Sequence, residues 1–116
     1  MTIERIESGT RMSKAVVHGD TVYLAGQVAD RSAGATVREQ TGEILGIIDA
    51  LLAKAGTDKT KLLSANIWLT DIATFAEMNT VWDAWVAPGS APARATVQAQ
   101  LAAPQFKVEI AVIAAR

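Results

Sequence analysis

Residues 36–56 read TVREQTGEILGIIDALLAKAG, and their hydrophobic spacing establishes which type of fold to expect. The apolar residues and one threonine recur at intervals of three and four, which places them on one face of an α-helix. The stripe consists of Val37, Thr41, Ile44, Leu45, Ile48, Leu51, Leu52 and Ala55. Gly56 follows the last of these residues and predicts the end of the helix, because glycine readily takes the conformation that caps a helix.

The residues before this helix predict a β-hairpin. Two runs rich in β-branched and aromatic residues lie within residues 16–25 and are joined around Gly19 and Asp20, a pair that is typical of turns. Gly26 and Gln27 then end the second strand. A loop over residues 30–34 leads from the hairpin to the helix.

The residues after the helix predict a strand, a second helix and two final strands. Residues 62–70 alternate in the manner of a strand. Asp71 is a candidate N-cap for the second helix, which ends at the Pro-Gly pair of residues 88–89. The apolar stripe of this helix consists of Phe75, Met78, Trp82 and Val86. The two final strands contain Arg94 and Glu109.

The predicted order of elements is ββαβαββ, in a single domain over residues 1–116. This is an α+β fold with an antiparallel-rich mixed sheet and two helices on one of its faces. The other face is too apolar for water, so we expect it to pack against other copies of the chain. The residues expected there are Trp68, Thr96, Gln98, Gln100, Ala111 and Ile113, with Arg94 on the same face two positions before Thr96.

Arg94 and Glu109 are charged residues within otherwise apolar strands. Arg94 lies in APARATV (91–97) and Glu109 in KVEIAVIA (107–114). Because the side chains of a strand alternate between its faces, Glu109 shares a side with apolar residues. Burial of an unpaired charge is costly, so Glu109 is expected to have a partner. Either Arg94 is this partner or the two residues flank a common ligand.

The composition excludes several kinds of protein. With 11 Lys and Arg residues against 12 Asp and Glu, the net charge is −1, so no basic surface for nucleic acid or anionic membranes is expected. The chain has no Cys, which excludes disulfides and fits the cytoplasm. Its one histidine, His18, lies in the predicted turn, so neither a His-based metal site nor a nucleophilic triad is expected. We also expect no signal peptide and no membrane span.

Four segments in the right order carry a resemblance to a known family. The first three are residues 19–27 (GDTVYLAGQ), Gln40 with residues 54–56, and residues 69–79. The fourth is Pro-Ala-Arg at residues 92–94, followed by Glu109 within Val-Glu-Ile. In combination these segments resemble the Rid family (YjgF/YER057c/UK114), and the resemblance spans nearly the entire chain.

The resemblance implies a chorismate-mutase-like fold and a homotrimer, in which the sheets surround a central barrel and three clefts lie between subunits. It also implies a deaminase for reactive small carboxylates. Such enzymes hydrolyse 2-imino and enamine acids, for example 2-aminoacrylate or 2-iminobutanoate, to 2-keto acids and ammonia. They use no cofactor and no metal, and the chain has no recognised motif for either.

The resemblance also implies roles for individual residues. Arg94 is expected to bind the substrate carboxylate through its planar guanidinium. Glu109 is expected to position or activate the attacking water. The main chain of Ala25, Gly26 and Thr96 is expected to line the cleft. Asn79, in the middle of the second helix, is expected to hydrogen-bond a loop near the site.

Three departures from the family pattern affect the expected cleft. Ala25 replaces a serine and removes a hydroxyl group. Thr96 replaces a common cysteine. Residues 10–12 replace Gly-Pro-Tyr, which removes an aromatic ring that closes over the substrate and adds Arg11 as a second cation. We expect these changes to alter the preferred imine more than the binding of its carboxylate.

Other functions stay open. One is a pathway-specific enamine deaminase of a catabolic operon. Another is a non-catalytic trimer that binds small carboxylates, in which Glu109 forms a structural ion pair. The ribonuclease activity ascribed to some relatives is the least supported, because the chain has neither an excess of basic residues nor a pair of histidines.

Overall fold

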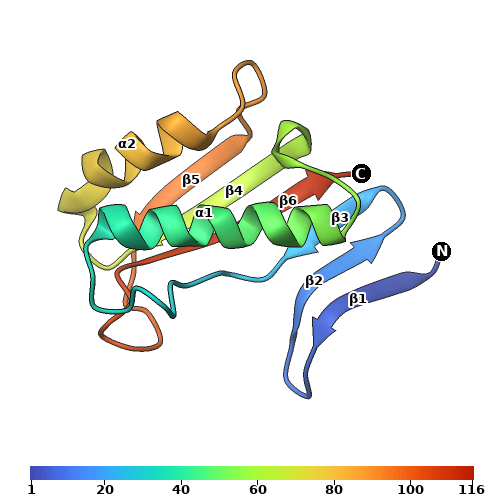
Figure 1. The fold of residues 1–116 in the computed structure, drawn as a ribbon, viewed down its shortest axis with the longest axis horizontal. Helices are drawn as coiled ribbons and strands as arrows, with labels where there is room; N and C mark the ends of the chain where they lie inside the picture. Colours follow the sequence, from blue (N-terminus) through green and yellow to red (C-terminus); the bar gives the residue numbers. More distant parts are fainter.

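The computed structural model describes all of residues 1–116, which form one sheet with two helices on it (Figure 1). In chain order the elements are β1 Ile3–Ser8, β2 Ser13–His18, β3 Thr21–Leu24, α1 Val37–Lys54, β4 Leu62–Leu69, α2 Phe75–Trp85, β5 Ala93–Gln98 and β6 Val108–Ala115. Two short 3-10 turns, Lys59–Lys61 and Ile72–Thr74, precede β4 and α2. The α+β class is therefore confirmed.

The six strands lie in the order β1-β2-β3-β6-β4-β5. All neighbouring strands are antiparallel except β4 and β5, which are parallel, so the prediction of a mixed sheet is also confirmed. Both helices lie on the same face of this sheet, with α1 across its middle and α2 beside β5 (Figure 1). Strands β1 and β5 form the two edges, where main-chain groups on the outer side have no neighbouring strand.

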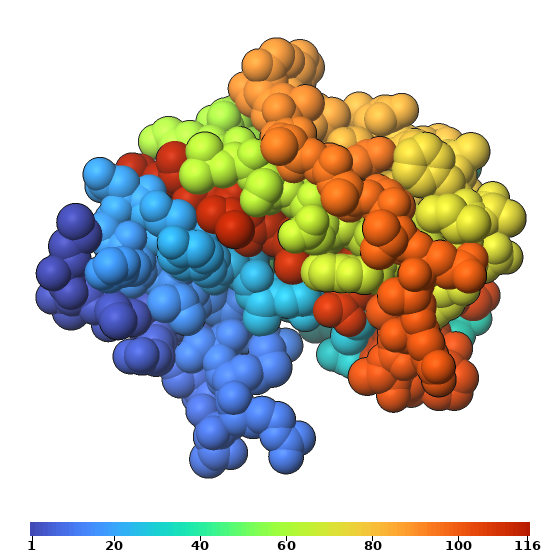
Figure 2. Space-filling view, turned by 180° about the vertical axis from the view of Figure 1, so that it is seen from behind, coloured from blue at the N-terminus to red at the C-terminus, as the bar shows by residue number.

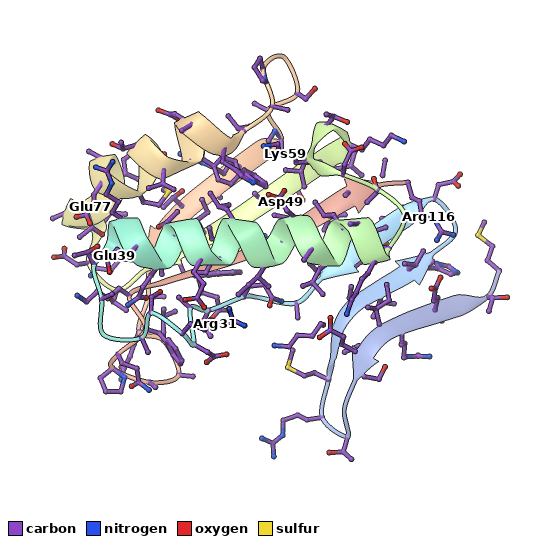
Figure 3. All side chains as sticks on the ribbon, viewed as in Figure 1. Arg31, Glu39, Asp49, Lys59, Glu77 and Arg116 are labelled. Carbon is purple, nitrogen blue, oxygen red and sulfur yellow. The ribbon has the colours of Figure 1, made fainter.

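Helix α1 begins and ends where its sequence predicts. The Thr36 hydroxyl oxygen accepts a hydrogen bond from the Glu39 N–H at 3.1 Å, which satisfies one of the free donors of the first turn. Gly56, with φ at +82°, follows the helix. The predicted apolar stripe is buried against the sheet. Glu77 of α2, which is labelled in Figure 3, accepts a hydrogen bond from the Arg38 N–H at 2.9 Å. The two helices are thereby joined at this end.

Helix α2 begins later than expected. The Asp71 carboxylate accepts a hydrogen bond from the Ala73 N–H, so it caps the 3-10 turn rather than the α-helix, which starts at Phe75. Of the predicted stripe only Met78 and Trp82 are buried, whereas Phe75 keeps 40% of its surface exposed. Neither α1 nor α2 is long and apolar enough to cross a membrane.

Strand β1 was not predicted, and the order ββαβαββ is wrong by this one element. Five of its six residues are exposed, because it is an edge strand with only β2 beside it. Its alternation of apolar and polar residues is correspondingly weak. At its end Glu7 has φ at +51° and forms an ion pair with Lys54 of α1 at 2.8 Å, which ties the edge of the sheet to the helix.

No helix covers the face of the sheet opposite α1 and α2, which is the face turned toward the viewer in Figure 2 (Figures 1 and 2). The register places Tyr23, Trp68, Val97, Ala111 and Ile113 on it. Tyr23 and Val97 remain 45% and 50% exposed, which is high for large apolar side chains. The prediction of an uncovered apolar face is therefore confirmed.

Candidate functional site

Arg94 lies on the helix side of β5, at the edge of the sheet. The parallel register pairs it with Ala65 of β4, which is buried beneath the helices. Its guanidinium carbon lies 5.2 Å from the centre of the Trp82 ring and 5.7 Å from the centre of the Phe75 ring, both on α2. Both distances are within the range of a cation–π interaction. The aromatic rings of α2 therefore form the immediate surroundings of this cation.

The expected face of β5 is wrong. We predicted Arg94, Thr96 and Gln98 on the uncovered face, but the register with β4 places them on the helix side. The alternation itself holds, since Arg94 and Thr96 do share a face. The error concerns which face this is, because a strand's own alternation does not say how it pairs with its neighbour. Gln100, also predicted on that face, lies in the loop after β5.

Glu109 lies on the uncovered face of β6, where the register pairs it with Trp68 of β4. Its neighbours along the strand, Val108 and Ile110, are both buried on the helix side. Partial burial raises the pKa of the Glu109 carboxyl above its ordinary value, and no cation or hydrogen-bond donor lowers it. Glu109 is therefore a partly desolvated carboxylate without a partner in its own chain.

Gly26 lies directly against the Glu109 carboxylate. A Cβ atom at Gly26 would overlap the Glu109 carboxylate oxygen and lie 2.9 Å from its Cδ, so only glycine permits this approach. The main-chain groups of Gly26 make no hydrogen bond, which leaves its N–H free as a donor. Gln27, which is buried, fixes this segment because its N–H donates to the Ile110 carbonyl at 2.8 Å.

The main-chain groups of Ala25, unlike those of Gly26, are hydrogen-bonded within the chain. Its N–H donates to the Lys14 carbonyl at 2.9 Å, and its carbonyl accepts a hydrogen bond from the Gln27 side chain at 2.7 Å. Both main-chain groups of Ala25 are thus used within the chain. Of the Ala25–Gly26 pair expected to line the cleft, only Gly26 has main-chain groups available for a ligand.

Arg94 and Glu109 do not form an ion pair. The two ion pairs of the chain are Lys54–Glu7 and Arg116–Glu4, neither of which includes Arg94 or Glu109. Because Arg94 lies on the helix side of the sheet and Glu109 on the opposite side, the sheet separates them. Of the two possibilities that the sequence leaves open, direct pairing within one chain is excluded.

The other predicted residues lie in different surroundings. Thr96 and Asn79 each have a buried side-chain oxygen without a hydrogen-bond donor, so the bond expected from Asn79 to a loop is not formed. Arg11 is exposed in the turn between β1 and β2. Figure 2 shows a notch between this turn and the loop that precedes β6. The β1–β2 turn with Arg11 and strand β5 with Arg94 lie at opposite edges of the sheet, so the chain does not bring the two arginines together.

The hollows of the single chain do not bring the predicted residues together. The pocket of about 220 Å³ beside Gly26 is lined by α1 and by the Glu7–Lys54 pair, without Arg94 or Glu109. A wider hollow of about 730 Å³ lies along the loop of residues 98–104. No three His, Asp or Glu side chains lie close enough together to hold a metal ion. One chain thus carries two separate half-sites, one at Arg94 and one at Glu109 with Gly26.

Comparisons with known proteins identify the family. Residues 2–116 match the family described as Endoribonuclease L-PSP. The chain is 47% identical over 114 residues to a RutC family protein of Haemophilus influenzae, with 98% of each chain covered. It is 48% identical over 115 residues to the RutC family protein YoaB of Escherichia coli strain K12, with 99% of each covered. The chain belongs to the Rid (YjgF/YER057c/UK114) family.

A solved structure extends this relationship to the fold. NMB1025 of Neisseria meningitidis, a member of the YjgF protein family, has a TM-score of 0.96 to this chain at 44% identity, covering 100% of this chain and 96% of that one. The Rid-family resemblance that the sequence indicates is confirmed, and so is the chorismate-mutase-like fold of this family.

Sequence reasoning missed two residues of the Arg94 half-site. Phe75 and Trp82 were assigned only to the apolar stripe of α2, yet both rings lie within 6 Å of the guanidinium carbon. Their spacing of seven residues, two helical turns, places them on one side of α2. This spacing was visible in the sequence. Their position over β5 was not, because it depends on how α2 packs on the sheet.

Proposed function

We propose that this Rid-family protein hydrolyses reactive 2-imino and enamine acids to 2-keto acids and ammonia, without a cofactor or metal. The observation that carries the proposal is the pair of half-sites: an unpaired guanidinium on one face of the sheet and an unpaired, partly desolvated carboxylate on the other. A 2-imino acid offers a group for each, since its carboxylate pairs with Arg94 and its C=N carbon is attacked by a water that Glu109 activates.

The two half-sites meet, in this proposal, in the clefts of a homotrimer. The uncovered apolar face, with exposed Tyr23 and Val97, supports close packing between copies. The opposite placement of Arg94 and Glu109 supports a cleft that takes Arg94 from one copy and Glu109 with Gly26 from the next. A free Gly26 N–H beside the carboxylate gives such a cleft a hydrogen-bond donor for the reacting water or for the substrate.

The reaction needs only proton transfers and orientation. Water adds to C2 of the imine and gives a proton to Glu109, while the nitrogen takes up a proton. The C2–N bond then breaks, ammonia leaves, and the hydroxyl oxygen loses its proton to form the keto group. A raised pKa brings Glu109 closer to neutral pH, where a carboxyl both accepts and returns a proton efficiently. Arg94 fixes the substrate carboxylate and with it the distance between C2 and the water.

Binding without turnover is the second candidate, and it rests on the same unpaired Arg94. It predicts affinity for 2-keto acids with no acceleration of hydrolysis. The ribonuclease name of the family finds little support in this chain, whose net charge is −1 and whose one histidine, His18, is exposed beside the β2–β3 turn.

The test is the hydrolysis of imino acids that an amino-acid oxidase produces in situ, with semicarbazide as the competing trap. The wild-type protein is expected to release keto acid faster than buffer does, and Arg94→Ala to lower kcat/KM by about 100-fold through loss of a charge-assisted bidentate pair. Arg38→Ala, an exposed arginine of α1, is the control and should retain the wild-type rate. No acceleration by the wild type over a panel of side chains, together with binding of pyruvate, would favour the second candidate.

A further inference from the structure

The chain contains two cations stacked on tryptophans of α2, and only one of them, Lys59, also has a hydrogen-bond acceptor within the chain. Lys59 lies 5.2 Å from the centre of the Trp85 ring, and Arg94 lies 5.2 Å from the centre of the Trp82 ring. The Lys59 ammonium donates to the Trp85 carbonyl at 2.6 Å, and the Trp85 indole donates to Asp49 at 3.0 Å. Asp49 and Lys59 are labelled at this junction in Figure 3. The Lys59 ammonium and the Trp85 indole N–H thus each have a hydrogen-bond acceptor within the chain.

The Arg94 guanidinium, by contrast, has no hydrogen-bond acceptor within the chain. The two rings near its guanidinium have π-faces that attract a cation but accept no conventional hydrogen bond. Neither ion pair of the chain includes Arg94. Between the two rings, four residues after Phe75, the same side of α2 carries Asn79, whose buried Oδ1 has no donor. The stacking therefore restrains the guanidinium, while its N–H groups remain available for an acceptor from outside the chain.

We infer that Trp82 and Phe75 are positioning residues for Arg94, which hold its guanidinium ready for a substrate carboxylate; this inference rests on the proposed function. An arginine side chain has many rotamers, and a carboxylate that binds a mobile guanidinium must first order it. Two rings two turns apart on one helix, both within cation–π range, restrict these rotamers before the ligand arrives. They act on binding, because the carboxylate is the same in the substrate and in the transition state.

The test compares ring-removing variants in the intact protein, with pyruvate as the probe for binding. Trp82→Leu and Phe75→Leu are each expected to raise the pyruvate Kd, and the KM for imino acids, by about 5- to 30-fold, with kcat changed less than about threefold. Trp82→Phe, which keeps a ring, should restore most of the affinity. Trp85→Phe is the matched control, since it alters a ring that packs 5.3 Å from Trp82 but does not stack on Arg94, and it should leave Kd unchanged.

A double-mutant cycle separates positioning from a general effect on the fold. In an Arg94→Ala background, Trp82→Leu should have no further effect on Kd or KM, because there is no guanidinium left to hold. An additional loss in that background would overturn the inference. Since Trp82 is buried, far-UV circular dichroism and melting are measured for each variant, and the more exposed Phe75→Leu keeps the test valid if Trp82→Leu unfolds.

The two proposals fail differently. If Arg94→Ala leaves pyruvate binding and turnover intact, the proposed function is wrong and the positioning role falls with it. If Arg94→Ala weakens binding and turnover while both ring-removing variants bind like the wild type and show its KM, the function stands and the inference about Trp82 and Phe75 is wrong.

Discussion

Arg94 and Glu109 extend from opposite faces of one sheet. Arg94 lies beneath α2, within cation–π range of Trp82, whereas Glu109 lies on the face without helices, against Gly26. Neither has a partner of opposite charge in the chain. If one small substrate needs both residues, they must come from two copies of the chain. This relationship connects the fold to the proposed inter-subunit cleft.

The pKa of Glu109 leads to a prediction about stability. Because burial raises this pKa in the folded chain, the folded state binds the proton more tightly than the unfolded state does. The contribution of Glu109 to stability is therefore full below its unfolded pKa and is lost as the pH rises through its folded pKa. At pH 8 the ionised side chain opposes folding, so Glu109→Gln should melt a few degrees higher than the wild type, and this difference should vanish near pH 4.

Melting curves of the two proteins from pH 4 to pH 8 check this prediction. Turnover should meanwhile be lost in Glu109→Gln, since an amide accepts no proton from water. A Glu109→Gln protein that melts below the wild type at pH 8 would contradict the prediction, and would mean that a cation pairs with Glu109 in the assembled protein.

Gly26→Ala should displace the Glu109 carboxylate, because the new Cβ would overlap it. We expect kcat to fall by about 10- to 100-fold while the fold persists, since alanine tolerates the ordinary backbone angles of this position and the carboxylate end is free to swing away. In the pH–rate profile the limb due to Glu109 should move toward lower pH as the side chain becomes solvated.

The control for this substitution is Gly46→Ala in α1, where a Cβ meets no atom within 4 Å. It should retain full activity and add about 0.5–1 kcal/mol of stability, because alanine favours the helix. Wild-type kinetics in Gly26→Ala would show that the close approach of Gly26 and Glu109 has no part in the reaction.

Gln40 should be a strong determinant of stability. This fully buried side chain donates to the carbonyls of Ala35 and Gln105 at 3.1 and 3.0 Å, and accepts a hydrogen bond from the Lys107 N–H at 2.9 Å. Gln40→Ala leaves the Ala35 carbonyl and the Lys107 N–H without partners, although the Gln105 carbonyl still accepts a hydrogen bond from the Gly34 N–H, and should reduce the free energy of unfolding by about 2–4 kcal/mol. Urea denaturation measures this loss.

Gln100→Ala provides the comparison, since Gln100 is exposed in the loop after β5 and should change stability by less than about 0.5 kcal/mol. Limited proteolysis should in addition cut the loop before β6 faster in Gln40→Ala. Equal unfolding free energies for Gln40→Ala and the wild type would contradict the role assigned to Gln40.

The elements that the sequence predicts well are those with strong local periodicity. The 36–56 pattern predicts α1 to within a residue or two, and the turn at Gly19 predicts the β2–β3 hairpin, because caps and turns depend on neighbouring residues only. Strand β1 escaped prediction because an exposed edge strand needs no apolar alternation. The apolar face without helices was predicted because residues 110–115 of β6 are all apolar, so neither face of this strand is suited to water.

The arrangement of the site depends on longer-range relationships. The face of Arg94 was predicted wrongly because it is set by the parallel register of β5 on β4, which no local pattern encodes. The stacking of Trp82 on Arg94 depends on the position of α2 over β5. The contact between Gly26 and Glu109 likewise needs the pairing of β6 with the segment after β3, so the sequence names these residues without showing which of them meet.

The most direct test of the inter-subunit site is complementation between two inactive variants. Arg94→Ala and Glu109→Gln chains are co-expressed with different tags, mixed forms of the proposed trimer are isolated, and imine hydrolysis is measured beside each variant alone. If every site takes Arg94 from one copy and Glu109 from the next, each mixed trimer has both intact residues at one of its three sites, so about a third of the wild-type activity should return. If the mixed trimers are as inactive as the two parents, each site uses both residues of the same chain and the account is wrong.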